Sequence, residues 1–260
     1  MLQRIVCKLE RVDNNTRVYL PGDAFHGVLM EQLDAGSVEE FHTQDIKPYS
    51  QYIDTRCDGV FWIVQTLTRK ACRQVIEPLA SPAFSTFYLK RLNTNITISE
   101  KNQSEIPMKD LVSRFYFDRS ERILRVQFTT PTAFKSGGEY VFYPSLRLLL
   151  GSLMRKYSSI VEGNRESDEE TLESLVNNTK IVRYNLKSVY SEIERVRLPA
   201  FCGTIVIKAS GPQPLVNYLH FLLRFGEYSG VGIKCAMGMG AMKVIDKPVN
   251  RDKEGRGAND

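Results

Sequence analysis

The sequence predicts an α+β protein with two tandem ferredoxin-like domains, each in the element order βαββαβ, and a glycine-rich loop near the C-terminus. Segments with an apolar residue at every second position alternate with segments whose apolar residues recur every three or four positions. The same order of segments begins again near residues 110–122. The chain has 260 residues, 42% of them hydrophobic, which is enough for two small cores. We therefore expect an N-terminal domain over residues 1–115, a C-terminal domain over 116–247 and a disordered tail over 248–260.

The first domain opens with a strand and an amphipathic helix. Residues 2–10 alternate between apolar and polar, and one face of this strand carries Ile5, Cys7 and Leu9. The helix is expected to begin after Asp23 and to end at Gly36. Its apolar positions are spaced i, i+3, i+4 and i+8, at Phe25, Val28, Leu29 and Leu33.

A second, short helix should follow directly, because Ser37 and Glu40 have the spacing of a capping box. This helix ends in a polar loop after His42. The other elements of the first domain are predicted as a buried strand over 58–67, a helix over 68–80 that is ended by Pro78, and one strand over 85–100.

The second domain repeats this pattern. Its elements are predicted as strands over 122–130, 181–193, 201–210 and 240–246, with helices over 144–157 and 213–228. Pro144 and Ser145 open the first helix. Its apolar stripe consists of Leu146, Leu149, Leu150, Leu153 and Tyr157. The acidic stretch over 162–175 is expected to be a solvated surface insertion.

Near the C-terminus, four glycines surround Lys234: Gly230, Gly232, Gly238 and Gly240. This is not a dinucleotide-binding loop, because a helix precedes the glycines and a strand follows them, the reverse of the required order. It is not a P-loop either, because no Ser or Thr follows Lys234. Two interpretations remain. The loop is a main-chain surface that binds a sugar–phosphate backbone, or the glycines serve only a tight connection from helix to strand.

Composition excludes some classes of protein and leaves others open. The net charge of +5 is compatible with nucleic-acid binding but does not establish it. The five cysteines are scattered without the spacing of zinc ligands, so we expect reduced thiols, no metal and no cofactor. No apolar run reaches the length of a membrane span and no secretory core opens the chain, so we expect a cytoplasmic protein.

Three motifs, in this order along the chain, resemble a known family. They are "FHGVLMEQLD" followed by "VEEFH", then "TPTAFKSGGEYVFYPSLRLLLGSLMRKY", and last the GxGxKxxxGMG pattern from Gly230 to Gly240. Together they resemble the CRISPR-associated repeat-processing endoribonucleases of the RAMP superfamily, and are most similar to those of type III-A systems. The resemblance covers residues 1 to about 246.

The resemblance implies a metal-independent endoribonuclease that cuts CRISPR precursor RNA within its repeats. Attack by a 2′-hydroxyl would leave a 2′,3′-cyclic phosphate and a 5′-hydroxyl. The implied partners are CRISPR repeat RNA and, transiently, a type III effector complex, and the protein would act as a monomer or homodimer.

Histidine suits such chemistry because its imidazole exchanges protons near neutral pH. Of the three histidines, His42 holds the position of the family's histidine and is expected to be the general acid or base. His26 is a second candidate, with a pKa depressed by the helix N-terminus, while His220 among leucines is expected to be partly buried. Lys47 would stabilise the charge of the transition state, and Tyr49 would orient the 2′-hydroxyl.

RNA phosphates are expected at the glycine loop and at basic side chains. The expected binding residues are Gly230, Gly232, Lys234, Gly238, Gly240, Lys135, Ser136, Arg195 and Arg197, the two arginines alternating along one strand with Arg183 and Lys187. The aromatic signature of the ordinary RNA-recognition motif is absent, so an aromatic platform should contribute less.

Two other functions stay open. Met30 and Glu31 stand where better-known members of the family carry a tyrosine, which favours a catalytically silent subunit that holds repeat or guide RNA. A small-molecule enzyme on the same fold would need a nucleotide or metal motif, and none is found.

Overall fold

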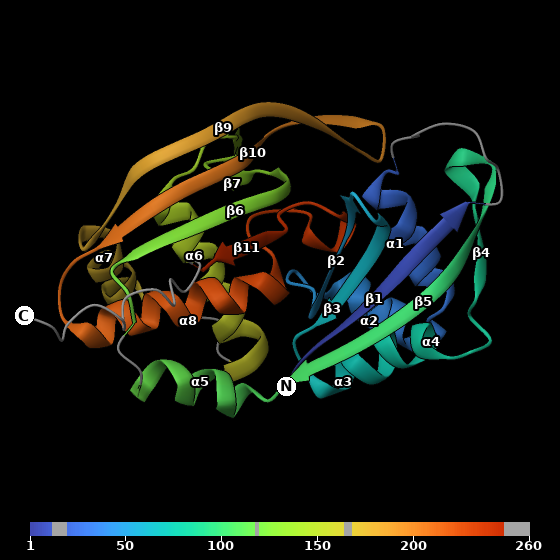
Figure 1. Ribbon diagram of the computed structural model, residues 1–260, viewed down its shortest axis with the longest axis horizontal. Coiled ribbons are helices and arrows are strands. Elements are labelled where there is room, and N and C mark those ends of the chain that lie inside the picture. Colours follow the sequence, from blue (N-terminus) through green and yellow to red (C-terminus); the bar gives the residue numbers. More distant parts are fainter. Residues whose placement is uncertain (12–19, 118–119, 164–167, 247–260) are drawn as a thin grey trace, which may run out of the picture.

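The computed structural model describes residues 1–11, 20–117, 120–163 and 168–246, so the tail expected over 248–260 lies outside the described residues (Figure 1). Two antiparallel sheets lie side by side, and a short two-stranded ribbon accompanies the second. In each sheet the first strand of the domain lies between its third and its last strand, as in ferredoxin-like folds. The predicted fold class is confirmed.

The first sheet has the order β2-β3-β1-β5-β4. Its strands are β1 (Leu2–Arg11), β2 (Tyr49–Arg56), β3 (Gly59–Thr66), β4 (Thr86–Leu89) and β5 (Thr94–Ile106). The single strand expected over 85–100 is wrong, because a turn with Asn93 at φ 48° separates β4 from β5. Strand β2 was not predicted, since its first four residues are buried on both faces and do not alternate.

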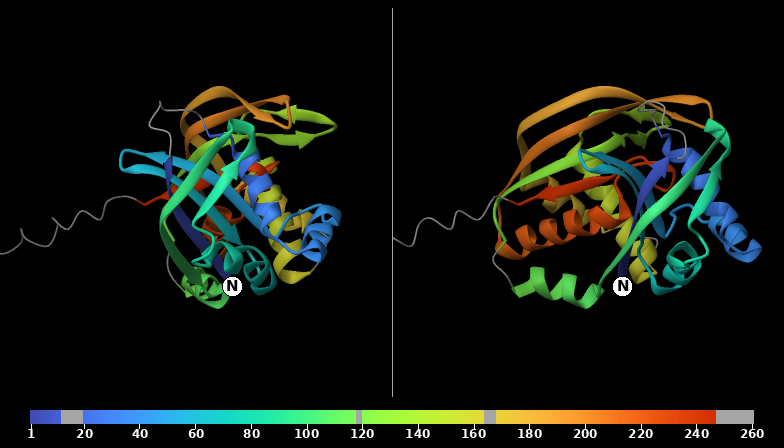
Figure 2. Two further views of the ribbon diagram at one scale, coloured as in Figure 1. Left: turned by 90° about the vertical axis from the view of Figure 1, so that its right-hand side faces the viewer. Right: turned by 45° about the vertical axis from the view of Figure 1, so that its right-hand side comes forward.

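The second sheet has the order β11-β6-β10-β9. Its strands are β6 (Ile123–Thr132), β9 (Thr179–Ile193), β10 (Val196–Ala209) and β11 (Met242–Ile245). The accompanying ribbon consists of β7 (Phe134–Ser136) and β8 (Glu139–Val141), and it projects from the body of the molecule (Figure 2, left). All four predicted strands of this domain are present.

Helix α1 (Gly22–Glu31) is shorter than expected, and α2 (Ala35–Thr43) begins earlier. Gly36 lies inside α2 and does not end α1. The N-cap is Asp34, whose side chain accepts a hydrogen bond from the Ser37 backbone N–H at 2.9 Å, so the capping box predicted at Ser37 is wrong. Because Asp34 caps the helix, the Glu40 side chain is free to form hydrogen bonds with residues outside α2.

The next helical segment runs through α3 (Arg69–Ala71), a π turn (Cys72–Ile76) and α4 (Glu77–Ala80). Pro78 was expected to end it, but the segment continues. The π turn shifts the hydrogen-bond register, so Pro78 falls in the first turn of α4, where its missing N–H is tolerated.

The helices of the second half are α5 (Met108–Phe117), α6 (Leu146–Tyr157), α7 (Glu169–Asn177) and α8 (Gln213–Ser229), with a π turn at Ser158–Glu162 after α6. α6 and α8 bury their leucines against β6 and β10 in one core. Leu111 and Phe115 of α5 also belong to this core, as do Leu172 and Leu175 of α7 within the acidic stretch. The stretch is therefore anchored to the core by an amphipathic helix.

A separate core lies in the first domain around Trp62, which is fully buried and packs on Phe25 at 5.3 Å between ring centres. The domains are joined at the buried ends of β2 and β3, because side chains there satisfy the last carbonyls of α8. Ser50 Oγ donates to the Tyr228 carbonyl and Gln65 Nε2 to the Glu227 carbonyl, both at 2.6 Å.

Gln51 joins the start of α1 to the glycine loop. Its fully buried Nε2 donates to the Gly22 carbonyl at 2.7 Å and to the Ala236 carbonyl at 3.0 Å, and its Oε1 accepts from Trp62 Nε1 at 3.0 Å. A Cβ on Gly22 would lie 2.8 Å from the Cα of Gly238. The two main chains therefore touch at this point because neither residue has a side chain.

We expect Gly22→Ala to lower the free energy of unfolding by about 1–3 kcal/mol, because the new methyl group overlaps rigid backbone. Gly27→Ala on the same helix is the matched control, since a Cβ there meets nothing within 4 Å. The control should be neutral or stabilising by up to about 1 kcal/mol. Chemical denaturation of both variants measures the difference. Equal stabilities would contradict the close approach.

Candidate active site

His42 lies in the last turn of α2 and is exposed to solvent. The residue before it, Phe41, is buried and packs on Tyr49 at 5.0 Å between ring centres. Phe41 therefore fixes the end of the helix against β2 while the imidazole of His42 stays accessible.

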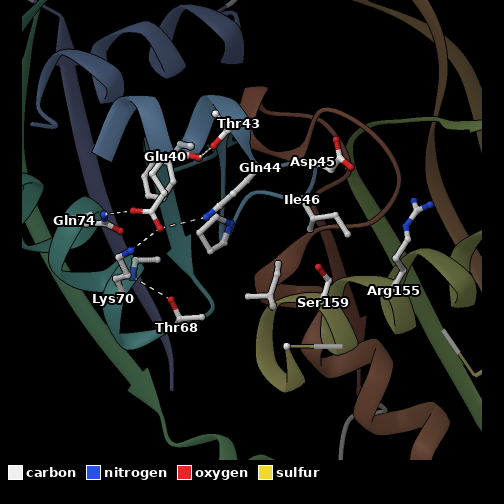
Figure 3. Close-up of a pocket in the computed structure, with 15 residues that line it drawn as sticks. Glu40, Thr43, Gln44, Asp45, Ile46, Thr68, Lys70, Gln74, Arg155 and Ser159 are labelled. Atoms are coloured by element: carbon white, nitrogen blue, oxygen red, sulfur yellow. Dashed lines mark hydrogen bonds and ion pairs between the residues drawn. The ribbon is translucent and has the colours of Figure 1, made fainter. Parts of the chain in front are cut away.

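Glu40 ties α2 to the helical segment beside it. Its carboxylate accepts hydrogen bonds from Lys70 Nζ at 2.5 Å and from Gln74 Nε2 at 3.1 Å (Figure 3). These residues line an open cleft of about 920 Å³, whose other side is formed by Arg155 and Ser159 of the second domain. His42 does not line this cleft, so the cleft lies beside the histidine and not around it.

His26 lies on α1 and is half-buried, with its ring stacked on Tyr49 at 6.3 Å between centres and 23° between planes. Its Nδ1 is buried, and no group in the described part of the chain forms a hydrogen bond with it. Burial has the largest effect on the pKa of His26 and lowers it. Glu194 raises this pKa, whereas His42 and two lysines lower it further. The expected depression is present, but burial is its main cause and not the helix N-terminus.

These electrostatic effects identify the charged groups that lie close to His26, because charges act strongly only over short distances. The groups that act on the pKa of His26 come from four separate segments of the chain: Glu194, His42, Lys47 and Lys234. They therefore lie near His26, at the junction of the two domains. We call these four residues, His26 and Tyr49, which are the candidates for the catalytic groups, the catalytic cluster.

Tyr49 was expected in a polar loop, but it is the first residue of β2 and is only 2% exposed. Its hydroxyl is buried and has no hydrogen-bond partner among the residues that the structure describes. Burial raises the pKa of Tyr49 above its ordinary value, so the phenol keeps its proton. The side chain is therefore available as a hydrogen-bond donor within the cluster.

Lys47 lies in the loop between α2 and β2, where its Nζ donates to the Gln44 carbonyl at the end of the helix. Burial lowers the pKa of Lys47, Asp45 raises it, and Lys234 lowers it further. The effect of Lys234 on Lys47 means that the two lysines lie in the same small region, although they belong to different domains.

Lys234 is exposed and has a left-handed backbone conformation, with φ 55°. Its Nζ lies 3.6 Å from a carboxylate oxygen of Glu194, which is in the turn between β9 and β10. The Glu194 backbone N–H donates to Asp23 at 3.1 Å, and Arg91 bridges Asp23 at 2.5 Å and Glu192 at 3.3 Å. The tip of the β9–β10 hairpin is thus bound to the start of α1.

The four glycines of the loop are explained by contacts inside the protein. A Cβ on Gly232 would lie 2.2 Å from the Ala133 carbonyl oxygen, and one on Gly240 would lie 2.1 Å from the Val231 carbonyl oxygen. Gly230, Gly232, Gly238 and Gly240 all have positive φ. Their backbone N–H groups donate to acceptors within the protein: Gly226, Ser152, Cys235 and Pro131. The tight-connection interpretation therefore accounts for the glycines, and the loop presents Lys234.

Lys156 of α6 holds this loop and was missed in the sequence. It is 8% exposed, and its Nζ donates to the carbonyls of Ser229 at 3.1 Å and Gly230 at 3.0 Å and contacts Cys235 Sγ at 3.0 Å. Ser152, one turn earlier on α6, accepts from the Gly232 N–H at 3.0 Å. The only signal in the sequence is a lysine next to a leucine stripe, which ordinarily indicates a surface position.

The basic residues expected to bind RNA lie outside the cluster, apart from Lys234. Arg197 lies on β10 with its guanidinium 3.9 Å from the centre of the Tyr190 ring. Arg195 does not alternate along a strand as expected, because it lies in the β9–β10 turn with φ 68°. Lys135 and Ser136 are exposed on β7.

His220 lies apart from the cluster on α8. Its Nε2 is 2.6 Å from the Glu121 carbonyl oxygen, and burial lowers its pKa. Within the described ranges, no three His, Cys, Asp or Glu side chains gather as a metal site. No helix in the same ranges has the length and apolar composition to cross a membrane.

Comparison with known proteins gives a consistent result. A family model described as "CRISPR-associated endoribonuclease Cas6" matches residues 126–242. A Mycobacterium tuberculosis protein with the same description is 36% identical over 247 residues, covering 94% of this chain and 78% of that protein. Its counterpart from Streptococcus thermophilus is 33% identical over 250 residues, covering 95% of this chain and 99% of the relative.

Solved structures agree with the fold. A product complex of a Thermus thermophilus Cas6 has a TM-score of 0.76 at 19% identity and covers 94% of this chain and all of the other. A second Cas6 product complex also has a TM-score of 0.76, at 22% identity, and covers 94% of this chain and 99% of its own.

The buried position of His26 predicts a pH-dependent stability. Below its ordinary pKa of about 6.5, the unfolded chain takes up a proton at His26 that the folded chain resists. The free energy of unfolding should therefore fall as the pH drops below about 6.5. His26→Gln should remove this part of the dependence and His42→Gln should keep it, as measured by denaturant unfolding at pH 5.5 and 7.5. The same pH dependence in His26→Gln and in the unaltered protein would contradict the burial of the ring.

Proposed function

The chain belongs to the Cas6 family of CRISPR-associated endoribonucleases, and we propose that it cuts CRISPR precursor RNA within its repeats to make guide RNAs. The observation that carries the proposal is that His42, Lys47 and Lys234, which come from both domains, all lie near enough to His26 to lower its pKa. Imidazoles and cations are the groups that RNA cleavage needs without a metal.

In the proposed reaction the ribose 2′-oxygen attacks the neighbouring phosphorus and loses its proton to a base. The bond from phosphorus to the 5′-oxygen breaks, and an acid protonates that oxygen. The products are a 2′,3′-cyclic phosphate and a 5′-hydroxyl, with no water consumed and no redox change. His42 is accessible to RNA and acts as the general acid or base.

His26 and Tyr49 have complementary roles in this proposal. Because burial lowers the pKa of His26, its imidazole stays neutral near pH 7 and accepts a hydrogen bond or a proton. Because burial raises the pKa of Tyr49, its phenol stays protonated and donates. The stacked pair would orient the 2′-hydroxyl.

Lys47 and Lys234 approach the site from the two domains and would stabilise the negative charge that builds up on the phosphate. Lys135, Ser136, Arg195 and Arg197, together with the glycine loop that presents Lys234, would hold phosphates further along the RNA. We further propose a cytoplasmic protein, monomeric or homodimeric, that transfers its product to a type III effector complex.

We expect His42→Ala to slow single-turnover cleavage of repeat RNA in EDTA by about 10²–10⁴-fold while RNA affinity changes less than severalfold, because only proton transfer is lost. His220→Gln is the control and should cut at the normal rate, since His220 lies apart from the cluster.

The same assay tests the reaction itself. An RNA with a 2′-deoxy substitution at the scissile nucleotide should remain uncut. Tight binding without cleavage of the unmodified RNA would favour the silent RNA-holding subunit, and full activity of His42→Ala would refute the assignment of His42.

Lys234→Ala should weaken RNA binding and lower the slope of log affinity against log salt by about 0.7, the value for one phosphate contact with a single strand. Lys109→Ala, at an exposed position on α5, should leave the slope unchanged. Anisotropy titrations at several salt concentrations measure both. An unchanged slope in Lys234→Ala would mean that this lysine contacts no phosphate.

A further inference from the structure

The β9–β10 hairpin, residues 179–209, holds most of the net positive charge of the protein. This segment has six Lys and Arg residues and two Glu residues. Its cations are Lys180, Arg183, Lys187, Arg195, Arg197 and Lys208. Both acids form ion pairs, Glu192 with Arg91 and Glu194 with Lys234, whereas none of the six cations has an ion pair in the part of the chain that the structure describes. The hairpin is therefore a strip of uncompensated positive charge.

Two exposed aromatic rings lie on β9, the strand that also carries three of these cations. Tyr184 is 72% exposed and Tyr190 59% exposed, although both lie on a strand. They share one face of the hairpin with Arg197, because they pair with Ile205 and Pro199 in an unbroken register and Arg197 lies two residues before Pro199. By the same alternation Lys180, Arg183, Lys187 and Lys208 lie on the other face. The Arg197 guanidinium lies over the Tyr190 ring at 3.9 Å.

The face that carries Tyr184 and Tyr190 extends from the catalytic cluster along the hairpin. The hairpin arches from the second domain towards α1, and its turn at Glu194 is bound there to Asp23 and Lys234 (Figures 1 and 2). Tyr190 lies six positions after Tyr184, a span of about 20 Å along the strand. That length accommodates several nucleotides of an extended RNA strand. β8 lies beside β10. Three further exposed rings lie on β8 or directly after it in the sequence: Tyr140, Phe142 and Tyr143.

We propose that the β9–β10 hairpin binds unpaired nucleotides that flank the cleaved bond, with bases stacked on Tyr190 and Tyr184 and a phosphate held by Arg197 on the same face. The proposal rests on the RNA-cleaving function given above and adds the form of the substrate. Aromatic rings among lysines and arginines bind single strands because unpaired bases expose their faces, whereas those of a duplex are already stacked. The arrangement of Arg197 on Tyr190 leaves a cation beside the stacked base.

A second copy of this chain is the other occupant that an exposed edge strand could take. Two-fold pairing through β9 would place the same patch of both chains together, and six uncompensated cations would face six. Charge complementarity therefore favours RNA.

The test uses full-length protein and a short fluorescein-labelled oligouridine, alone or annealed to its complement. Tyr184→Ala and Tyr190→Ala should each weaken binding of the single strand about tenfold and leave duplex binding unchanged. Tyr190→Phe should bind like the unaltered protein, because the ring is kept. Tyr88→Ala is the matched control, since Tyr88 is 45% exposed on the edge strand β4 of the first domain.

Equal losses on single strand and duplex, or no loss in either alanine variant, would overturn the proposal. So would a dimer that dissociates in Tyr184→Ala, as measured by light scattering. Cleavage of repeat RNA is measured in parallel and separates the two proposals. An unaltered protein that binds oligouridine through its tyrosines but never cuts repeat RNA refutes the function and keeps the stacking surface. Normal cleavage with unaffected tyrosine variants refutes only the stacking surface.

Discussion

The close approach of Gly22 and Gly238 is the contact that holds the catalytic cluster in place. α1 carries His26 and the glycine loop carries Lys234, so the separation of these two groups is set by touching main chains and not by flexible side chains. Gln51 bonds to both main chains from a fully buried position and is itself held by Trp62. A satisfied buried network of this kind permits one arrangement of the two domains, since any shift leaves a polar group unpaired.

Much of the fold was predictable from local sequence. The four strands and the helices α6 and α8 of the second domain have strong periodicity and were identified, because a helix or strand with one buried face leaves a clear apolar pattern. Helices α5 and α7 were not predicted. The predictions failed where buried side-chain contacts, or a shift in the hydrogen-bond register of a helix, override the local apolar pattern. β2 was missed because Ser50 and Gln51 are buried through contacts with the other domain and Tyr49 is buried against Phe41 of its own domain. Pro78 did not end its segment because a π turn precedes it.

The site was only partly predictable. The motifs drew attention to His42, Lys47 and Lys234, and the structure brings Lys47 and Lys234 close enough to shift the pKa of Lys47. The residues that position them could not be found, because their roles depend on contacts across long stretches of chain. Lys156 lies 79 residues from Cys235, and Asp23 lies 171 residues from Glu194. Neither contact can be inferred from the composition of the sequence or from the spacing of its residues.

The catalytic cluster combines segments from opposite ends of the chain, which bears on its synthesis. His26 and His42 emerge early from the ribosome, whereas Lys234 and β11 emerge last, and β11 then pairs with β6 to complete the second sheet. Domains fold as units during translation, at about 5–20 residues per second. The N-terminal domain therefore has time to fold while the cluster is still incomplete. A nascent chain that ends before the glycine loop holds both histidines without the lysine that faces them, so the complete cluster forms only when translation is nearly finished.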